Sequence, residues 1–343
     1  MKNRKALTLI FLTVFIDLLG FGILIPILPT FATVKLHMDE TAIGIVLAVY
    51  SFMQFIFNPL FGKLSDKYGR KPLITFSLLL NAIGYVIFAY TNSFALLIIS
   101  RIVGGIGGSS VSVAMAYIAD ITTKKDRSHG MGMIGAAFGL GFVFGPLIGG
   151  ILSKYGYEIT GFGAAAFSFM AFLTTVFFLP ESNLNLKKLE EAKRKILDIT
   201  ALKKVFTHPN VGMLIVLFFI QTFAMANIYG TFALIGYEHY HFTDMQNGLM
   251  YGILGLVSAI VQGGLLKYIA KYLDQKNLLK FGSVAMMLGL GLIPYGGGFA
   301  GLAIIVSLMS LGGGILQPTI LSMISTIAPD TEQGITLGTN QSM

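Results

Sequence analysis

The chain has 343 residues, of which 55% are hydrophobic and only 12% carry a formal charge. A soluble protein of this length has roughly twice that share of charged residues, so the composition excludes a soluble enzyme and favours a multi-span membrane protein. There are no cysteines, which excludes disulfides, thiolate metal sites and cysteine nucleophiles. The net charge of +8 suggests nucleic acid as a partner, and the positions of the charges decide whether this holds.

Long stretches nearly free of charge are the main feature of the sequence, and a helix needs about 20 apolar residues to cross a bilayer. The first six stretches are 6–31, 41–62, 72–90, 94–119, 128–153 and 159–180. After a polar segment, four more follow at 209–237, 245–266, 281–294 and 301–328, and 333–343 resembles the start of an eleventh. The sequence therefore predicts an all-α membrane protein with ten spans plus the start of an eleventh. We divide it into an N-terminal six-helix half (1–180), a cytoplasmic central linker (181–208) and an incomplete C-terminal half (209–343).

The basic residues predict the orientation of these spans. With the N-terminus in the cytoplasm, all Lys and Arg residues fall in cytoplasmic segments except Lys35, Lys154 and Arg101. This asymmetry follows the positive-inside rule, so the positive charge is a topology signal and nucleic-acid binding loses its support. The first stretch resembles a signal peptide, but it is too long and contains Asp17, so we interpret it as a permanent span.

Asp17 and Arg101 are the two ionisable residues inside predicted spans. Each costs at least about 2.5–3.5 kcal/mol at mid-bilayer, so each needs a reason to be there. One interpretation is a structural ion pair between the first and fourth spans. The other is a proton or substrate site that lines an aqueous cavity and alternates between two environments.

Glycines and a short charged segment are the other signals. The fifth span contains closely spaced glycines around Pro146, which favour either ordinary close helix packing or a seam that controls which side of the membrane is open. The segment Gly62–Pro72 is predicted to be either a cytoplasmic anchor or a tight, defined turn, in which Asp120 is a ready partner for Arg70.

These motifs resemble those of a known family. Gly62–Pro72 resembles the signature loop between helices two and three of the major facilitator superfamily. The first span, from Asp17 to Gly22 with Pro26 and Pro29, resembles its drug:proton antiporters, and Arg101 with Gly104 and Gly105 resembles the fourth-helix motif. Gly141–Gly150 is similar to the fifth-helix motif of the exporter branch. The closest likeness within the family is to tetracycline exporters and multidrug-efflux proteins.

The resemblance implies a major-facilitator-type bundle and a role for each matching residue. Asp17 and Arg101 would take part in proton coupling. A cytoplasmic latch would consist of Gly62, Asp66, Gly69, Arg70 and Asp120, and an antiporter motif of Gly141, Gly145, Pro146, Gly149 and Gly150. Tetracycline exporters carry an acidic residue in helix three near Gly84, whereas Asn81–Tyr85 has none, which argues against metal–tetracycline as the substrate.

The bundle would place a substrate cavity at mid-membrane between the two halves. Its candidate lining residues are Gln54, Asn58, Phe138, Phe142, Gln221, Asn227 and Gln317, each of which has ordinary interhelix packing as its alternative. A lining rich in Phe and Met suits lipophilic compounds and lipophilic cations. There is no nucleotide-binding motif, so we expect no cofactor and a proton gradient as the energy source.

We therefore expect a proton-coupled exporter of small lipophilic compounds, a monomer in the cytoplasmic membrane with no bound metal and no nucleic-acid partner. One alternative is a symporter or uniporter for a metabolite, which the fifth-helix motif disfavours. A membrane-embedded enzyme would need a catalytic cluster within the spans, yet all five histidines lie in loops or at span ends. A channel or receptor would not need two halves with an aspartate in the first helix.

The length is short for the expected architecture. A twelve-helix transporter at this density of spans needs on the order of 60 more residues. The sequence therefore predicts either a fragment or a shortened protein that lacks the last helices.

Overall fold

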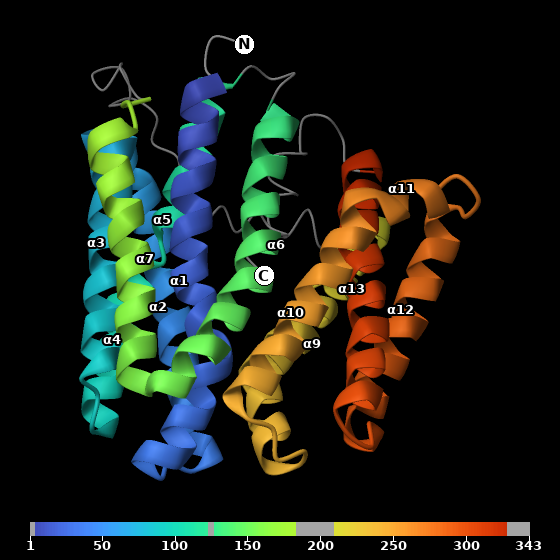
Figure 1. Ribbon diagram of the computed structural model, residues 1–343. Helices are drawn as coiled ribbons and strands as arrows, with labels where there is room; N and C mark the ends of the chain where they lie inside the picture. The colour runs from blue at the N-terminus through green and yellow to red at the C-terminus, as the bar shows by residue number, and fades with distance from the viewer. Residues whose placement is uncertain (1–3, 123–126, 183–208, 328–343) are drawn as a thin grey trace. The chain divides into compact units, whose positions relative to one another are not determined.

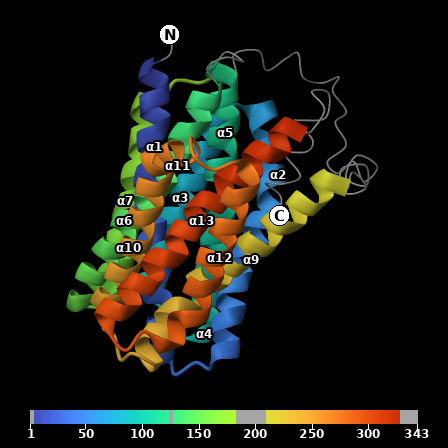
Figure 2. The same ribbon diagram turned by 90° about the vertical axis from the view of Figure 1, so that its right-hand side faces the viewer.

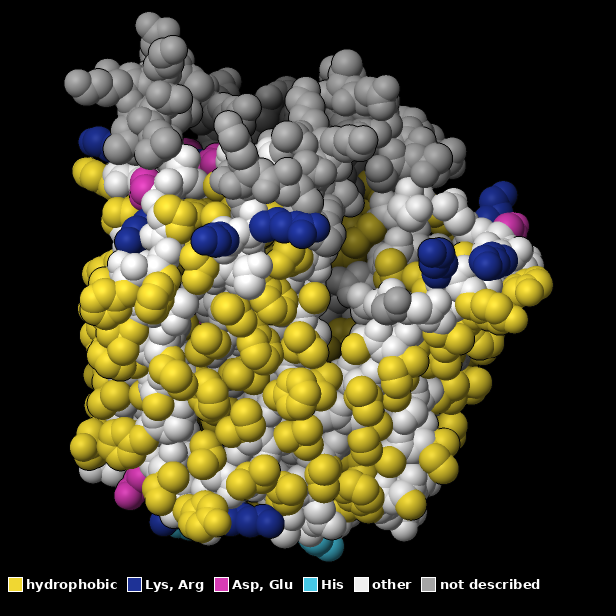
Figure 3. Space-filling model, turned by 45° about the horizontal axis from the view of Figure 1, so that its top comes forward, with side chains coloured by type: hydrophobic (Ala, Val, Ile, Leu, Met, Phe, Trp, Pro, Cys, Tyr) yellow, Lys and Arg dark blue, Asp and Glu magenta, His cyan; other side chains and the backbone are white. Residues whose placement is uncertain are grey.

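The computed structural model describes residues 4–122, 127–182 and 209–327, and within these ranges the chain is almost entirely helical. Nine of the described helices are long and apolar enough to cross a membrane. On the face shown in Figure 3, hydrophobic side chains cover the helices, while Lys and Arg side chains collect at the edges. This pattern matches the basic span ends and apolar span centres expected from the sequence.

The chain divides into two compact units, and the first comprises residues 1–193 with 233–252. Its helices in chain order are α1 (Arg4–Leu36), α2 (Glu40–Tyr68), α3 (Arg70–Ala89), α4 (Phe94–Gly107), α5 (Ser110–Ile121), α6 (Arg127–Leu152) and α7 (Tyr157–Phe178), shown in Figure 1. A 3₁₀ turn, Ser153–Tyr155, joins α6 to α7. The fourth predicted span is thus two consecutive helices, α4 and α5, separated at Gly108 and Ser109.

Helix α1 is the central element of the first unit. It packs along α6 and α7, while α3 packs along α4 and α7. Ile10, Ile23 and Ile27 of α1 are fully buried, whereas outer positions such as Phe177 of α7 are 71% exposed. An apolar side chain can remain exposed on a membrane helix because the lipid is itself apolar. A polar residue in the middle of α1 is therefore held inside the bundle.

The second unit comprises residues 194–232 with 253–343, and α9 and α10 run through both units. The elements are α9 (Pro209–Glu238), α10 (Asp244–Ile260), the π-helical turn η3 (Val261–Leu265), α11 (Leu266–Ile269), α12 (Gln275–Leu292), the 3₁₀ turn η4 (Ile293–Tyr295) and α13 (Phe299–Ile327). Helices α12 and α13 lie side by side in both ribbon views (Figures 1 and 2). Gly289 allows their close approach, because a Cβ there would lie 2.6 Å from the Cα of Met309.

Two predicted boundaries differ from the observed ones. Most of the predicted loop 62–72 is helical, because α2 continues to Tyr68 and α3 begins at Arg70, which leaves Gly69 as the only break. The reason is that polar residues continue a helix beyond the membrane until a glycine ends it. The predicted eighth span is α10 followed by the π-turn η3 and the short α11, so no single regular helix covers it. The predicted start of an eleventh span, 333–343, and most of the linker, 183–208, lie outside the described residues.

Candidate functional site

Asp17 lies in the middle of α1 and is only 4% exposed. Asn81 of α3 donates to its two carboxylate oxygens at 3.0 and 3.2 Å. Ser110 of α5 donates to Oδ2 at 2.9 Å, and Ser168 of α7 donates to Oδ1 at 2.7 Å. Within the part of the chain that the structure describes, no Lys or Arg forms an ion pair with Asp17. The carboxyl group is therefore held by neutral donors from three other helices, and its charge has no counter-ion there.

Asn81, Ser110 and Ser168 are not among the residues predicted from the sequence. Their signal is a polar side chain inside an apolar span, which is weaker than a charge because serine and asparagine are common in membrane helices. In the sequence, Asn81 differs from its neighbours only in lying where tetracycline exporters carry an acidic residue. The structure gives it a position of its own: Gly107 of α4 leaves room for it, since a Cβ at Gly107 would lie 2.5 Å from Asn81 Oδ1.

Arg101 of α4 is also buried, but it does not pair with Asp17. Its guanidinium carbon lies 5.9 Å from the ring centre of Tyr50 and 5.7 Å from that of Phe88, which is cation–π geometry. Its Nε donates to Ser100 Oγ at 3.3 Å, and its Nη2 has no hydrogen-bond partner among the described residues. The first interpretation from the sequence, a structural ion pair between Asp17 and Arg101, is therefore wrong for this structure.

Two tyrosines connect the environments of the two charged residues. Tyr50 of α2 and Tyr85 of α3 are both buried, and each lies within electrostatic range of Asp17 and of Arg101. The Tyr85 hydroxyl has no hydrogen-bond partner among the described residues. Asp17 and Arg101 thus belong to one cluster of side chains from different helices, although they do not touch.

The predicted cavity residues of the first unit lie beside this cluster. Gln54 Nε2 donates to the Gly108 carbonyl at 3.2 Å and to the Tyr50 hydroxyl at 3.4 Å. Phe142 stacks on Phe138 with ring centres 6.3 Å apart and meets Phe21 edge-on at 6.1 Å. Phe21 in turn stacks on Tyr50 with ring centres 5.4 Å apart, so these residues form a connected polar and aromatic surface.

The other predicted cavity residues have separate surroundings. Asn58 Oδ1 is buried without a hydrogen-bond partner among the described residues, and the Asn58 carbonyl accepts from Ser112. In the second unit, Gln221 Nε2 donates to the Gly313 carbonyl at 3.5 Å, Asn227 Nδ2 donates to its own helix, and Gln317 is exposed. Because these three lie in a different unit, a single cavity remains a prediction.

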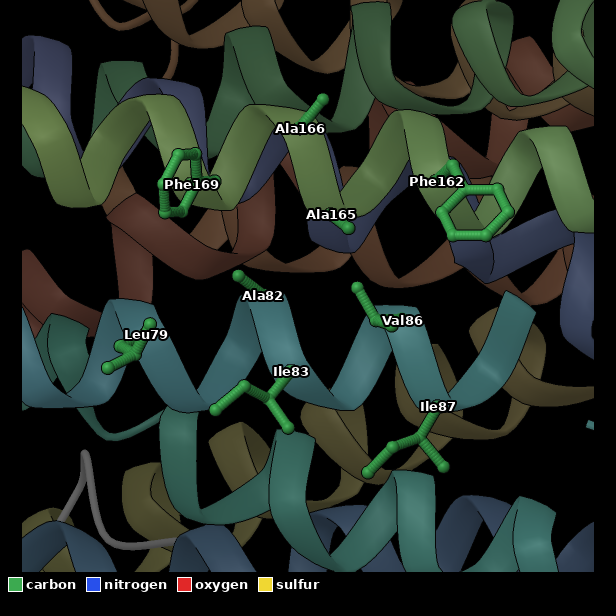
Figure 4. A pocket seen from close by; sticks show the side chains of 9 residues that line it. All are labelled: Leu79, Ala82, Ile83, Val86, Ile87, Phe162, Ala165, Ala166 and Phe169. Atoms are coloured by element: carbon green, nitrogen blue, oxygen red, sulfur yellow. The ribbon is translucent and has the colours of Figure 1, made fainter. Parts of the chain in front are cut away.

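A pocket of about 420 Å³ lies elsewhere, between α3 and α7 (Figure 4). Its lining is Leu79, Ala82, Ile83, Val86, Ile87, Phe162, Ala165, Ala166 and Phe169, so it includes none of the predicted cavity residues. Several of these side chains are about 40% exposed. Its lining is apolar, as expected of a surface that contacts lipid chains.

The predicted latch residues are brought together at the junction of α2 and α3. The Arg70 guanidinium contacts Asp66 at 2.6 Å and Asp120 of α5 at 2.9 Å. It also donates to Ser65 Oγ at 2.6 Å and to the Gly62 carbonyl at 3.4 Å. The predicted pairing of Arg70 with Asp120 is confirmed, and it ties α5 to the α2–α3 junction.

Glu181, the first residue of the predicted linker, forms a contact that the sequence does not predict. Its carboxylate accepts from the backbone nitrogens of Arg70 at 2.9 Å and Lys71 at 3.0 Å, so it caps the N-terminus of α3. Gly69, the residue before α3, has φ 103° and ψ 155°, a backbone conformation almost restricted to glycine. A Cβ at Gly69 would lie 2.5 Å from Glu181 Oε2. Gly69 therefore supplies both the turn and the space for the cap.

We predict that Gly69→Ala destabilises the protein more than Gly156→Ala. Gly156 has a similar φ of 118° with open space around it, so its substitution costs only the backbone strain, about 1–3 kcal/mol. Gly69→Ala has the same strain and also displaces the Glu181 cap, which adds about 1 kcal/mol. Thermal unfolding of the two purified variants measures the difference, and equal melting temperatures would contradict the role given to Glu181.

The glycines of the predicted antiporter motif mark two faces of α6. A Cβ at Gly145 would lie 2.6 Å from the Cα of Gly22 in α1, and Gly141 and Gly149 meet α1 at Leu18 and Ile23. On the other face, a Cβ at Gly150 would lie 2.8 Å from the Cα of Met245 in α10. The Pro146 carbonyl and Leu147 also contact α10, at Gly248 and Gly252. The motif is therefore a seam that packs α6 directly against both α1 and α10.

Known proteins similar to this chain include tetracycline and multidrug resistance proteins. The chain is 33% identical over 333 residues to tetracycline resistance protein, class E, of Escherichia coli, an alignment that covers 94% of this chain and 80% of that protein. It is 29% identical over 340 residues to multidrug resistance protein 1 of Bacillus subtilis, with coverage of 99% and 86%.

Similar folds occur among solved transporter structures. The human organic anion transporter MFSD10 aligns with a TM-score of 0.69 and 26% identity, over 100% of this chain and 90% of that one. The nucleoside transporter NupG aligns with a TM-score of 0.78 over 98% and 87%, but at 14% identity this likeness concerns the fold alone. The sequence profile of the Major Facilitator Superfamily matches residues 10–343. The chain therefore belongs to the Major Facilitator Superfamily, a family of multi-pass membrane proteins that transport small molecules and are not enzymes.

Proposed function

We propose that this chain is a proton-coupled exporter of small lipophilic compounds, which exchanges drug-like substrates for protons by alternating access. The observation that carries the proposal is the carboxyl group of Asp17, buried in the middle of α1 among neutral hydrogen-bonding side chains. A structural aspartate at this depth is expected to pair with a cation. A proton carrier instead needs surroundings that accept both of its charge states.

The partners of Asp17 suit both states. When Asp17 is ionised, Asn81 and the two serines all donate to it. When it is protonated, its O–H requires an acceptor, and a serine hydroxyl provides one because it both donates and accepts. Asn81 provides another, since its Oδ1 has no partner among the described residues and rotation of the amide would bring it to Asp17. Proton uptake and release therefore need only small side-chain movements.

We assign Arg101 a coupling role through the tyrosines rather than by direct contact. A buried guanidinium with one unpartnered nitrogen is available to pair with a carboxylate or an anionic group when the bundle rearranges. Tyr50 and Tyr85, which lie within electrostatic range of both charged residues, would carry the response between them.

The remaining assignments follow the same proposal. The latch around Arg70 would hold the outward-open state through its pairs with Asp66 and Asp120. The glycine seam of α6 would seal α1 and α10 together and prevent proton leak. Substrates would bind beside Phe138, Phe142 and Gln54, where the aromatic surface is joined to Tyr50 of the buried cluster.

For the whole chain we propose a monomer in the cytoplasmic membrane with a cytoplasmic N-terminus. It would consist of the halves 1–180 and 209–343, joined by the linker 181–208, with residues 245–266 crossing as the eighth of ten spans despite the π-turn. No cofactor would be needed, because one charge that moves through 100 mV releases about 2.3 kcal/mol. The relatives named for tetracycline and multidrug resistance support export over uptake.

The experiment is a growth-inhibition panel of lipophilic drugs and cations in an efflux-deficient bacterial host. We expect the chain to raise resistance to several lipophilic compounds, and we expect everted vesicles to accumulate the same compounds. Resistance to none of them, or accumulation in right-side-out cells instead, would contradict export and favour a metabolite symporter.

We predict that Asn81→Leu slows gradient-driven export about tenfold or more while the protein still folds. The substitution removes a donor worth about 1.5–3 kcal/mol from the ionised carboxylate, so the protonated form of Asp17 releases its proton less readily. Leu79→Ala, on the same helix but in the apolar pocket, is the matched control and should transport normally. Initial export rates at equal protein levels measure the difference, and equal rates for Asn81→Leu and the parent would refute the role of Asn81.

A further inference from the structure

A second partly buried carboxyl group lies about 20 Å along α1 from Asp17. Asp244, the first residue of α10, accepts a hydrogen bond from Thr30 Oγ1 of α1 at 2.7 Å. It also accepts one from the hydroxyl of Tyr157, the first residue of α7. Three elements that are far apart in the sequence, all within the first unit, therefore meet at one carboxylate.

Asp244 is not needed to cap its own helix. Thr243 and Gln246 form a reciprocal cap for α10: the Thr243 nitrogen donates to Gln246 Oε1 at 2.9 Å, and the Gln246 nitrogen donates to Thr243 Oγ1 at 3.3 Å. The Asp244 carboxylate instead contacts α1 and α7. Its contacts thus hold the first turn of α10 against two other helices.

The backbone of α6 comes close to the same turn. A Cβ at Gly150 would lie 3.0 Å from the Asp244 carbonyl and 2.8 Å from the Cα of Met245. The first turn of α10 is therefore tightly packed, and the Asp244 carboxyl group there is partly shielded from water.

The charge of Asp244 has no compensation in this arrangement. Among the described residues no Lys, Arg or His forms an ion pair with it, and the titratable groups that face it are Tyr157 of α7 and, beyond that, Tyr237 of α9. Neither is a cation that could balance the carboxylate. Partial burial raises the pKa of Asp244 above its ordinary value, and the hydrogen bonds from Thr30 and Tyr157 oppose this shift.

The direction of the pH effect follows from the two environments. When the first turn of α10 moves away, water surrounds the carboxyl group and its pKa returns toward the ordinary value. The packed arrangement, with the raised pKa, therefore binds the proton more tightly. The bound proton stabilises the packed arrangement fully when the pH is below the ordinary pKa of the carboxyl group. This stabilisation is lost as the pH rises through the raised pKa.

We propose that Asp244 is a proton-binding site, separate from Asp17, whose proton holds the first turn of α10 against α1 and α7 and whose ionisation releases it. The site goes beyond the proposed antiport and does not depend on coupling through Asp17. It would make separation of these helix ends respond to pH even without substrate or a gradient.

The test uses the full chain, which has no native cysteine, with spin labels at Lys35→Cys and Glu238→Cys. Both positions are exposed and lie at the ends of α1 and α9 in the first unit. In lipid nanodiscs, between about pH 5 and about pH 9, we expect the distance distribution of the parent to shift to longer values as pH rises. Asp244→Asn, which cannot ionise, should remain at the short distance throughout.

Three further variants make the result specific. Thr30→Val removes a donor to the ionised form, so its lengthening should occur at higher pH than in the parent. Glu158→Gln, which neutralises an exposed carboxylate beside Tyr157, should behave like the parent, and Asp17→Asn, which leaves Asp244 intact, should still lengthen as pH rises. A pH-dependent lengthening that persists in Asp244→Asn, or a parent distance that does not change with pH, would overturn the proposal. Because no transport is measured, failure of the proposed antiport would leave this result unaffected.

Discussion

Asp17→Asn is expected to abolish gradient-driven export while leaving the protein folded. Asparagine has nearly the same shape as aspartate, and its oxygen and nitrogen can pair with Asn81, Ser110 and Ser168, so the buried cluster remains hydrogen-bonded. It cannot take up or release a proton, so the coupled step is lost. Export in everted vesicles should fall to the level of the empty membrane, while substrate exchange without a gradient continues.

The matched control for this variant is Asp39→Asn. Asp39 is an exposed aspartate that caps α2 by accepting from the Ala42 nitrogen at 2.8 Å, so its substitution changes one carboxylate outside the cluster. It should export at the parent rate after correction for protein level. Full export by Asp17→Asn would remove the basis of the proton-coupled proposal.

Gly145→Leu is expected to prevent stable folding, at a cost of about 3 kcal/mol or more. Where α6 crosses α1, even a Cβ would lie 2.6 Å from the Cα of Gly22, and backbone cannot move aside as a flexible side chain can. Gly135→Leu, on the same helix with nothing near its Cβ, should be tolerated. Melting temperature by circular dichroism and yield of monodisperse protein provide the comparison, and similar values for both variants would contradict the seam between α1 and α6.

Spans and motifs were predictable from this sequence because both depend on local composition. A run of apolar residues long enough to cross a bilayer is visible without a fold, and so is an aspartate within it. The observed bounds of α1, α3 and α7 lie within a few residues of the predicted stretches at most of their ends. The pairing of Arg70 with Asp120 was also predictable, because both lie at the same predicted membrane edge.

The partners of buried groups were not predictable, because they depend on how each helix is rotated about its axis. Asp17 and Arg101 looked like a pair since they were the only charges inside spans, yet the rotation of α4 turns Arg101 toward Tyr50 and Phe88. Asn81, Ser110 and Ser168 are residue types that are common in membrane helices. Only the rotation of their three helices brings their side chains to the same carboxylate. Glu181 lies in a segment with no periodic pattern, so its role as the cap of α3, 111 residues away, had no local signal.

The central claim, proton-driven export through Asp17, is tested most directly by measuring both fluxes in liposomes with an acidic lumen. We predict that adding a compound identified by the resistance panel raises the luminal pH and that the compound accumulates inside. A protonophore or Asp17→Asn should abolish both effects. Accumulation that continues after the gradient is dissipated, or substrate transport with no change in luminal pH, would contradict the account.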